Sequence, residues 1–208
     1  SVAPVGDEGV ELDNGNPPGT AATLRVRLGA SGALQRIERS FGGAPGIGVN
    51  ASSSLRVYSS KSGSENAWDM STDGATFADA EPLATPSGAT LVRGPLYSEV
   101  VSWLDGPGPP VSEGTASLRF RVVVGDPTVH VSATTGPFDA QRGKSVDAVL
   151  RLDTSIASGD RWLTDANGMA FIERRRNWRP WFPGAWQDPV EPVSSNFYPM
   201  TLGALLPT

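Results

Sequence analysis

The chain contains no cysteine, a single histidine and no long apolar run among its 208 residues. The absence of cysteine excludes disulfide bonds and thiolate metal ligands. A zinc site takes three or four ligands, mostly histidine, cysteine or carboxylate, so the lone His130 does not make one. No stretch approaches the roughly twenty apolar residues that span a bilayer. The sequence therefore predicts no metal site within the chain and no membrane-spanning segment.

Basic residues are outnumbered: 17 lysines and arginines stand against 22 aspartates and glutamates, which gives a net charge of −5. Affinity for nucleic acid comes largely from basic side chains that neutralise phosphates, so no nucleic-acid partner is expected. The sequence also lacks the Gly-x-Ser-x-Gly turn of serine hydrolases and the glycine-rich loops that bind phosphates. These absences argue against serine hydrolases of that type and against nucleotide-binding enzymes.

Glycine and proline are abundant, with 24 and 18 residues, and they separate short apolar runs. Residues 24–28 alternate apolar and polar side chains, and residues 34–38 do so again after a glycine-bearing turn, which is the pattern of a β-hairpin. Similar runs follow at residues 96–104, 116–124, 128–133 and 146–154. No segment keeps a 3.6-residue apolar period. The sequence predicts an all-β fold, a large antiparallel β-sandwich.

The remaining segments are predicted from their composition. Residues 59–87 are rich in small and polar side chains and are expected to form a long loop. Residues 15–20 are expected to form a flexible insertion after an edge segment at residues 10–12. Residues 201–206 are expected to form a strand. Neither an internal repeat nor a composition boundary is visible, so residues 1–208 are predicted to form one β-sandwich region.

Several ordered elements near the end of the chain carry a resemblance to a known family. They are Thr164-Asp165-Ala166-Asn167-Gly168, Phe171-Ile172-Glu173-Arg174-Arg175-Arg176, Glu191-Pro192-Val193 and Asn196-Phe197-Tyr198-Pro199. This order and spacing resembles the C-terminal β-region of glycoside hydrolase family 38, the lysosomal and Golgi α-mannosidases. The family's region has a Thr-Asp-x-Asn-Gly turn, a strand ending in Arg-Arg and a segment like Glu-Pro-Val-x-x-Asn-Tyr-Tyr-Pro.

The resemblance implies a galactose mutarotase-like supersandwich, part of which is expected to lie outside this chain. In the family the catalytic nucleophile and the zinc ligands lie on an N-terminal α/β barrel that has no counterpart here, so no catalytic or metal residue is assigned. The resemblance implies that zinc is held by that barrel, either in the same precursor or in a companion chain. Its substrates would be mannose-containing glycans, cleaved at terminal α-mannosyl residues with retention.

The family's β-region supplies residues to the rim of the substrate pocket, including a tyrosine in a Ser-Gly-Ala-Tyr-like segment. The nearest match here is Ser64-Glu65-Asn66-Ala67-Trp68, so a tryptophan stands where the tyrosine would be. The first tyrosine of the Asn-Tyr-Tyr-Pro segment is replaced by Phe197. The resemblance assigns seven residues to the pocket rim: Trp68, Asp165, Asn167, Arg174, Arg175, Asn196 and Tyr198.

Two of these assignments have alternatives. Retaining glycosidases use two carboxylates about 5 Å apart, and a pair could be assembled from Asp160, Asp165, Glu173 and Glu191. However, the Asp165 to Gly168 segment is also typical of a tight turn, in which Asp and Asn bond their own backbone and Gly adopts a positive φ. The arginines at 174–176 would alternate in direction along a strand, so one is expected to meet a carboxylate at a domain junction or a sugar.

Aromatic residues gather between positions 162 and 198, namely Trp162, Trp178, Trp181, Phe182, Trp186 and Tyr198. Such side chains anchor protein interfaces and also stack on sugars, and an interface with the catalytic region is the preferred interpretation. The rival function is a glycan-binding or structural β-domain without turnover.

The triplet Asn50-Ala51-Ser52 permits N-glycosylation at Asn50. A sequon occurs in a similar place in some lysosomal members of the family. We therefore expect a secretory-pathway, lysosomal, vacuolar or extracellular protein.

Overall fold

The computed structural model describes residues 1–16, 22–42, 44–59, 80–105, 116–136, 146–178 and 193–207. Its sheets are antiparallel, and no helix in these ranges is long and apolar enough to cross a membrane. The chain divides into two compact units. The first comprises residues 1–57, 82–140 and 148–155, and the second comprises residues 58–81, 141–147 and 156–208.

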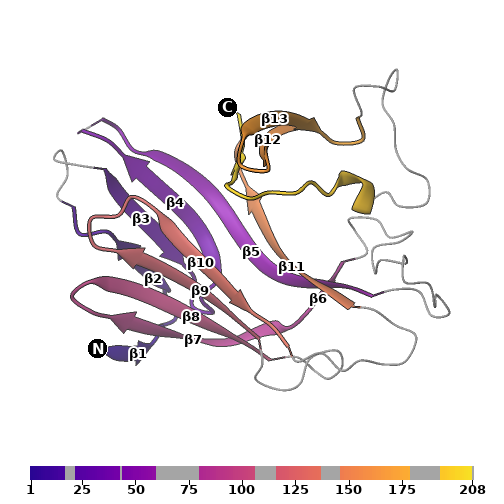
Figure 1. Cartoon of the computed structure of the whole chain (residues 1–208). Coiled ribbons are helices and arrows are strands. Elements are labelled where there is room, and N and C mark those ends of the chain that lie inside the picture. Colours follow the sequence, from indigo (N-terminus) through magenta and orange to yellow (C-terminus); the bar gives the residue numbers. More distant parts are fainter. Residues whose placement is uncertain are drawn as a thin grey trace. The chain divides into compact units, whose positions relative to one another are not determined.

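The first unit contains two sheets (Figure 1). One has five strands, in the spatial order β1 (Val2–Pro4), β7 (Thr85–Arg93), β8 (Tyr97–Asp105), β9 (Ala116–Val123) and β10 (Val129–Thr134). Sequential strands β7 to β10 pair with their chain neighbours, as expected for short connections between antiparallel strands.

The other sheet has six strands. Five follow the order β11 (Val146–Thr154), β5 (Ile47–Ser59), β4 (Leu34–Ser40), β3 (Thr23–Leu28) and β2 (Val10–Asp13), and β6 (Glu81–Pro82) pairs with β5. The hairpin expected at residues 24–38 is β3 and β4, joined with a register shift after Arg27. The predicted antiparallel all-β sandwich is confirmed.

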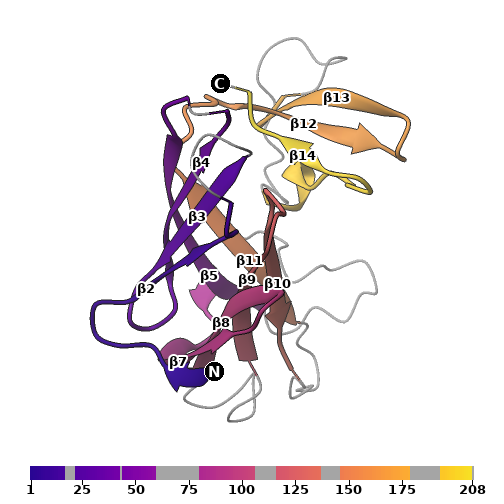
Figure 2. The ribbon, with the colours of Figure 1, turned by 90° about the vertical axis from the view of Figure 1, so that its left-hand side faces the viewer.

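Alternating side chains of the two sheets form the core of the first unit. Along β9 every second residue is buried, and Phe120 is fully enclosed. Along β3 the buried residues are Leu24, Val26 and Leu28, with exposed arginines between them. This two-residue period places one face of each sheet against the other and one face toward solvent (Figures 1 and 2).

A buried asparagine ties the edge of one sheet to a turn of the other. Asn14 is 1% exposed, and its Oδ1 accepts the backbone N–H of Leu24 at 3.1 Å. Its Nδ2 donates to the carbonyls of Ala22 and Asp126, at 2.8 and 3.2 Å. Three hydrogen bonds on one amide satisfy a polar group that burial would otherwise penalise.

The second unit holds a small sheet in the order β13 (Ala170–Arg175), β12 (Arg161–Ala166) and β14 (Ala204–Leu205), and the short 3₁₀ helix η1 (Ser194–Asn196). The turn between β12 and β13 has a φ of 52° at Asn167 and 72° at Gly168. The N–H of Met169 donates to the carbonyl of Ala166 at 3.0 Å. Two successive positive φ angles are those of a type I′ turn, so the predicted tight turn is confirmed.

The structure differs from the sequence predictions in two places. The loop expected at residues 59–87 includes β6 and the start of β7, because exposed strand ends rich in small residues lack apolar alternation. The strand expected at residues 201–206 is limited to β14, since the N–H groups of residues 201–203 bond a side chain. That residues 1–208 form one β-sandwich region stays a prediction, and within these residues the chain has two compact units. The chain passes between them several times, so no one linker marks a boundary.

Candidate functional site

A buried carboxylate organises the second unit. Asp165, on β12, is 1% exposed. Its Oδ2 accepts the N–H of Gly168 at 2.9 Å, across its own turn. Its Oδ1 accepts the N–H groups of Thr201, Leu202 and Gly203, at 2.9, 2.8 and 3.0 Å. One side chain therefore joins the β12–β13 turn to the segment that leads into β14.

The same contacts determine the ionisation of Asp165. The N–H of Gly203 contributes most, and with those of Gly168, Leu202 and Thr201 it outweighs desolvation and holds the pKa of Asp165 well below its usual range. A carboxylate that stays ionised and fully bonded to backbone donors has no proton to give and little freedom to attack. The geometry thus favours the structural role of Asp165 over a general acid or nucleophile.

On one face of this sheet an arginine lies against a tyrosine ring, which in turn contacts a tryptophan. The Nε of Arg174 donates to the Oγ1 of Thr164 at 3.0 Å. Its guanidinium carbon lies 4.7 Å from the ring centroid of Tyr198. The Tyr198 ring in turn meets Trp162 edge-on, with centroids 5.6 Å apart and planes at 72°. We call Trp162, Thr164, Arg174 and Tyr198 the arginine cluster. It fixes a planar cation by a hydrogen bond and by a cation–π contact.

Arg175 points the other way, as expected for neighbouring residues on a strand. In the register of β12 and β13, Arg174 pairs with Trp162 and Arg175 pairs with Arg161. The Nε of Arg175 lies 3.6 Å from a carboxylate oxygen of Glu173, and its guanidinium lies 5.8 Å from the Trp178 ring. The prediction that the arginines face different ways is confirmed for this pair.

Asn196 is buried and holds the segment that precedes Tyr198. Its Oδ1 accepts the N–H of Asn177, and its Nδ2 donates to the Oδ1 of Asn177, both at 2.9 Å. Asn177 has a φ of 54°, so this reciprocal pair also stabilises a left-handed residue just after β13. The pair links the exit of β13 to η1, since Asn196 is the last residue of that helix.

The structure thus places six of the seven predicted rim residues in the second unit. Arg174 and Tyr198 are in contact, Asp165 and Asn167 share one turn, and Asn196 positions the Tyr198 segment. Five of the candidate residues from the sequence lie outside the described residues: Trp68, Trp181, Phe182, Trp186 and Glu191. Sequence reasoning missed Thr164 and Asn177. Thr164 could have been found from the two-residue alternation that puts it on the face of Trp162, whereas Asn177 left no signal.

The described carboxylates of this unit do not assemble a metal site. Glu173 is half exposed and lies 3.9 Å from Arg161 as well as close to Arg175. Asp165 bonds backbone N–H groups. Within the described ranges, no group of three or more His, Cys, Asp or Glu residues could hold a metal ion. The donor set present there does not fit zinc.

His130 lies on β10 and makes a local pair. Its Nε2 lies 2.9 Å from the Oδ2 of Asp126, and about half of its side chain is exposed. That hydrogen bond, followed by those from Thr128, lowers the pKa of Asp126. His130 therefore forms a local pair with Asp126 at the surface of the first unit, beside the β9–β10 turn.

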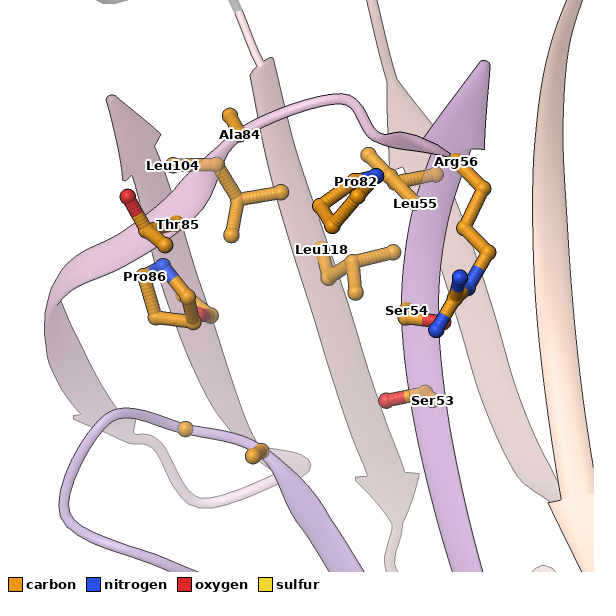
Figure 3. A pocket seen from close by; sticks show the side chains of 13 residues that line it. Ser53, Ser54, Leu55, Arg56, Pro82, Ala84, Thr85, Pro86, Leu104 and Leu118 are labelled. Carbon is orange, nitrogen blue, oxygen red and sulfur yellow. The ribbon is translucent and has the colours of Figure 1, made fainter. Parts of the chain in front are cut away.

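A pocket of about 210 Å³ opens in the first unit between β5 and the β7–β8 hairpin (Figure 3). Leu55, Leu104 and Leu118 supply much of its apolar wall, and Arg56 lies at its edge. The Oγ of Ser53 is buried there without a hydrogen-bond partner among the described residues. Among the described residues that line it, none is Asp, Glu or His. These described residues supply no acid–base pair.

The predicted glycosylation residue lies on an exposed part of β5. The Oδ1 of Asn50 accepts a hydrogen bond of 3.1 Å from Arg36, while its backbone pairs with Ser155. Ser52, the last residue of the sequon, is also exposed. Both groups that define the sequon are accessible on this strand.

Comparisons with known proteins agree with this architecture. The model of the glycosyl hydrolases family 38 C-terminal domain matches residues 21–203. An α-mannosidase of Arabidopsis thaliana is 33% identical over 115 residues, which cover 55% of this chain and 10% of that protein. The human lysosomal α-mannosidase is 31% identical over 115 residues, covering 53% and 10%. The α-mannosidase of Canavalia ensiformis is 23% identical over 186 residues, covering 86% and 17%.

The chain spans less than a fifth of the length of these relatives. The family match nevertheless covers most of the chain and includes the hairpin with Asp165 and the arginine cluster. The resemblance seen in the sequence is confirmed: the chain belongs to glycoside hydrolase family 38 and carries its C-terminal domain.

Proposed function

We propose that this domain completes the rim of an α-mannosidase active site, in which a catalytic region outside these residues cleaves terminal α-mannosyl groups of glycans. The family and the names of the relatives support hydrolysis of α-mannosides by the assembled protein. The domain's own contribution would be to bind and orient the substrate. By this proposal the 208 residues have no hydrolytic activity without the catalytic region.

The observation that carries the proposal is the double restraint on Arg174. One nitrogen is engaged by Thr164 and the guanidinium plane is held near Tyr198. Among the described contacts only Nε donates, so the terminal N–H groups are left to meet hydroxyl oxygens of a sugar. A donor fixed before the substrate arrives loses less conformational entropy on binding. Preorganised donors of this kind raise the rate when they meet the transition state better than the substrate.

The other rim residues would act through position. Asp165 and Asn167 set the turn next to the arginine cluster, and Asn196 sets the approach of Tyr198. Arg175, on the opposite face, would meet a carboxylate or a polar surface of the catalytic region. The role assigned to Trp68 stays a prediction from the family resemblance.

Zinc enters the proposal only as a group of the catalytic region, where it would polarise the substrate. The described residues of this domain do not provide its ligands. A glycan on exposed Asn50 and passage through the secretory pathway to an acidic compartment are further parts of the proposal.

The experiment compares arginine variants in the assembled enzyme, meaning this domain together with a family 38 catalytic region. Hydrolysis of 4-nitrophenyl α-mannoside is measured for Arg174→Ala and Arg174→Lys. We expect kcat/KM to fall by about tenfold or more with alanine, equivalent to about 1.4 kcal/mol. Lysine keeps the positive charge but lacks the planar guanidinium group with its several donors, so Arg174→Lys should retain only part of the rate.

Arg161→Ala is the matched control, because Arg161 is on the same sheet with a half-exposed side chain and a long ion pair of 3.9 Å. It should change the rate less than about twofold. Equal rates of hydrolysis for folded Arg174→Ala and Arg161→Ala would contradict the assignment of Arg174 to the pocket rim.

A further inference from the structure

The solvent-facing side of the five-stranded sheet carries an aromatic residue within a row of small side chains. Strand pairing aligns this row across four strands, from β7 to β10: Gly88, Trp103, Ser117 and Thr134. Paired residues of neighbouring strands point to the same side of a sheet. Trp103 alternates with buried Ser102 and Leu104, so this side is the outer one.

Trp103 is held in place and uncovered on one flank. Its side chain is 47% exposed, and its Nε1 donates to the Oγ1 of Thr90 at 3.4 Å. Its cross-strand neighbour Gly88 has no side chain, and a Cβ built there would meet nothing within 4 Å. The indole therefore presents an accessible and oriented apolar surface.

The adjacent row adds hydrogen-bonding groups beside the indole. It runs across the same four strands as Thr90, Val101, Arg119 and Ser132. Ser132 and Thr134 are exposed on β10, and Ser117 is half-buried on β9. The rows provide four hydroxyl groups and one guanidinium around one exposed aromatic ring.

Arg119 keeps most of its donors for a ligand. The Oε2 of buried Glu99 lies 2.8 Å from both Nε and one terminal nitrogen of Arg121. The Nε of Arg119 lies 3.9 Å from the same oxygen, and 44% of the Arg119 side chain is exposed. Arg121 makes the two short contacts to this oxygen, so Arg119 is the more weakly held of the two arginines.

We propose that this surface of the first unit is a further carbohydrate-binding site, which is formed by other residues than the arginine cluster and does not rest on the proposed catalytic role. A pyranose ring would stack its C–H face on Trp103. Its hydroxyl groups would bond the serine and threonine hydroxyls of the two rows and the Arg119 guanidinium. Trp103 and Thr134 lie two strands apart, which corresponds to a distance of about 10 Å across the sheet. One to two sugar rings have this length.

The composition of the surface decides against other ligands. A protein partner is normally bound through several clustered apolar anchors, whereas these two rows supply one exposed aromatic. A polyanion requires many basic residues, and the chain has a net charge of −5. A neutral, hydroxyl-rich ring fits one aromatic face surrounded by short hydroxyl side chains.

The folded 208-residue chain is titrated with α-linked mannotriose and, in a second experiment, with the neutral sugar cellotriose. Two-dimensional NMR measures the chemical shifts of the backbone amides. We expect shifts at the amides of Ser117, Arg119 and Thr134 with at least one of the two sugars. Trp103→Ala should weaken binding by about tenfold or more, and Arg119→Ala by roughly threefold.

Trp103→Phe keeps an aromatic face and should retain most of the affinity, which separates lost stacking from a damaged fold. Phe41→Ala is the matched control. Phe41 is also an exposed aromatic residue, at 54%, with Arg39 over its ring, but it follows β4 of the six-stranded sheet. It should bind as the unsubstituted chain does. No shift with either sugar at about 10 mM, or equal affinities for Trp103→Ala and Phe41→Ala, would overturn the proposal.

Discussion

The two units of the chain are stabilised by different kinds of interaction. In the first unit, alternating apolar residues such as Val26 and Phe120 fill the space between two sheets. In the second unit, the buried residues include Thr164, Asp165 and Asn196, and each of them bonds a partner distant in sequence. Apolar packing fixes the sandwich, whereas directional hydrogen bonds fix the hairpin and the segments around it.

The comparison explains where function is expected. Apolar packing tolerates volume-conserving exchange, so it sets the fold without selecting a chemistry. Hydrogen bonds from one side chain to several backbone groups set positions to within a fraction of an ångström, which substrate positioning requires. The described residues that we propose for the rim lie in the second unit, where buried side-chain hydrogen bonds of this kind are found. The following substitutions test that contrast.

The largest loss of stability is expected when a large side chain is removed from the core of the first unit. Phe120→Ala should lower the free energy of unfolding by about 3–5 kcal/mol, because it removes a fully buried ring and leaves a cavity. Urea unfolding of the chain measures it. Phe41→Ala, at an exposed ring, should change the same quantity by about 0.5 kcal/mol or less. Similar losses for the two variants would mean that the sandwich core does not carry the stability.

The next effect concerns the anchor of the second unit. Asp165→Asn replaces an acceptor oxygen with an N–H₂ group that faces backbone donors, so the melting temperature should fall by roughly 5 °C or more. Asp153→Asn is the control, because Asp153 is half exposed and pairs with Arg151 at the surface. An unchanged melting temperature for Asp165→Asn would show that the four backbone contacts are dispensable.

Asp165 also predicts a pH dependence of the free energy of unfolding. The folded pKa of Asp165 is lowered, so its ionisation stabilises the fold above the ordinary aspartate pKa of about 3.9. This contribution decreases as the pH falls below that value, because the unfolded chain takes up the proton first. Urea midpoints of the unsubstituted chain and Asp165→Asn should converge between about pH 4 and pH 2. A constant difference down to pH 2 would contradict this assignment.

A smaller effect is expected from the backbone of the hairpin turn. Gly168→Val places a β-branched residue at a φ of 72°, which should cost about 1–2 kcal/mol. An added Cβ would lie 3.8 Å from Leu202, an ordinary contact, so the cost is conformational rather than a clash. Gly168→Asn should cost less, since asparagine tolerates positive φ. If valine and asparagine destabilise the chain equally, the turn conformation is not the cause.

The smallest contrast compares two serines that line the pocket. The Oγ of Ser102 donates to the carbonyl of Ser31 at 2.6 Å, whereas the Oγ of Ser53 has no partner among the described residues. Ser102→Ala should cost about 1 kcal/mol, and Ser53→Ala should be neutral or slightly stabilising. Denaturant midpoints of the two variants measure the difference. A greater loss from Ser53→Ala would indicate a hydrogen bond to that hydroxyl.

Sequence reasoning reached the parts of the fold that local pattern determines. The alternation at residues 24–28 and 116–124 predicts β3 and β9, and Asn167-Gly168 predicts the turn, because period and turn chemistry are local properties. Residues 47–59 and 85–93 carry many small and polar side chains, so β5 and β7 left a weak signal. The donors to Asp165 lie 36 to 38 residues further along the chain. No local pattern could identify these donors, and the family resemblance named Asp165 but not its partners.

The central claim is that this domain completes an active site whose catalytic groups lie elsewhere. The most direct measurement is mannose release from 4-nitrophenyl α-mannoside by the chain, by a family 38 catalytic region, and by the two combined. We predict no release by the chain, and at least about a tenfold gain when it is added to the catalytic region. Release by the purified chain, or no gain in the mixture despite complex formation, would contradict the account.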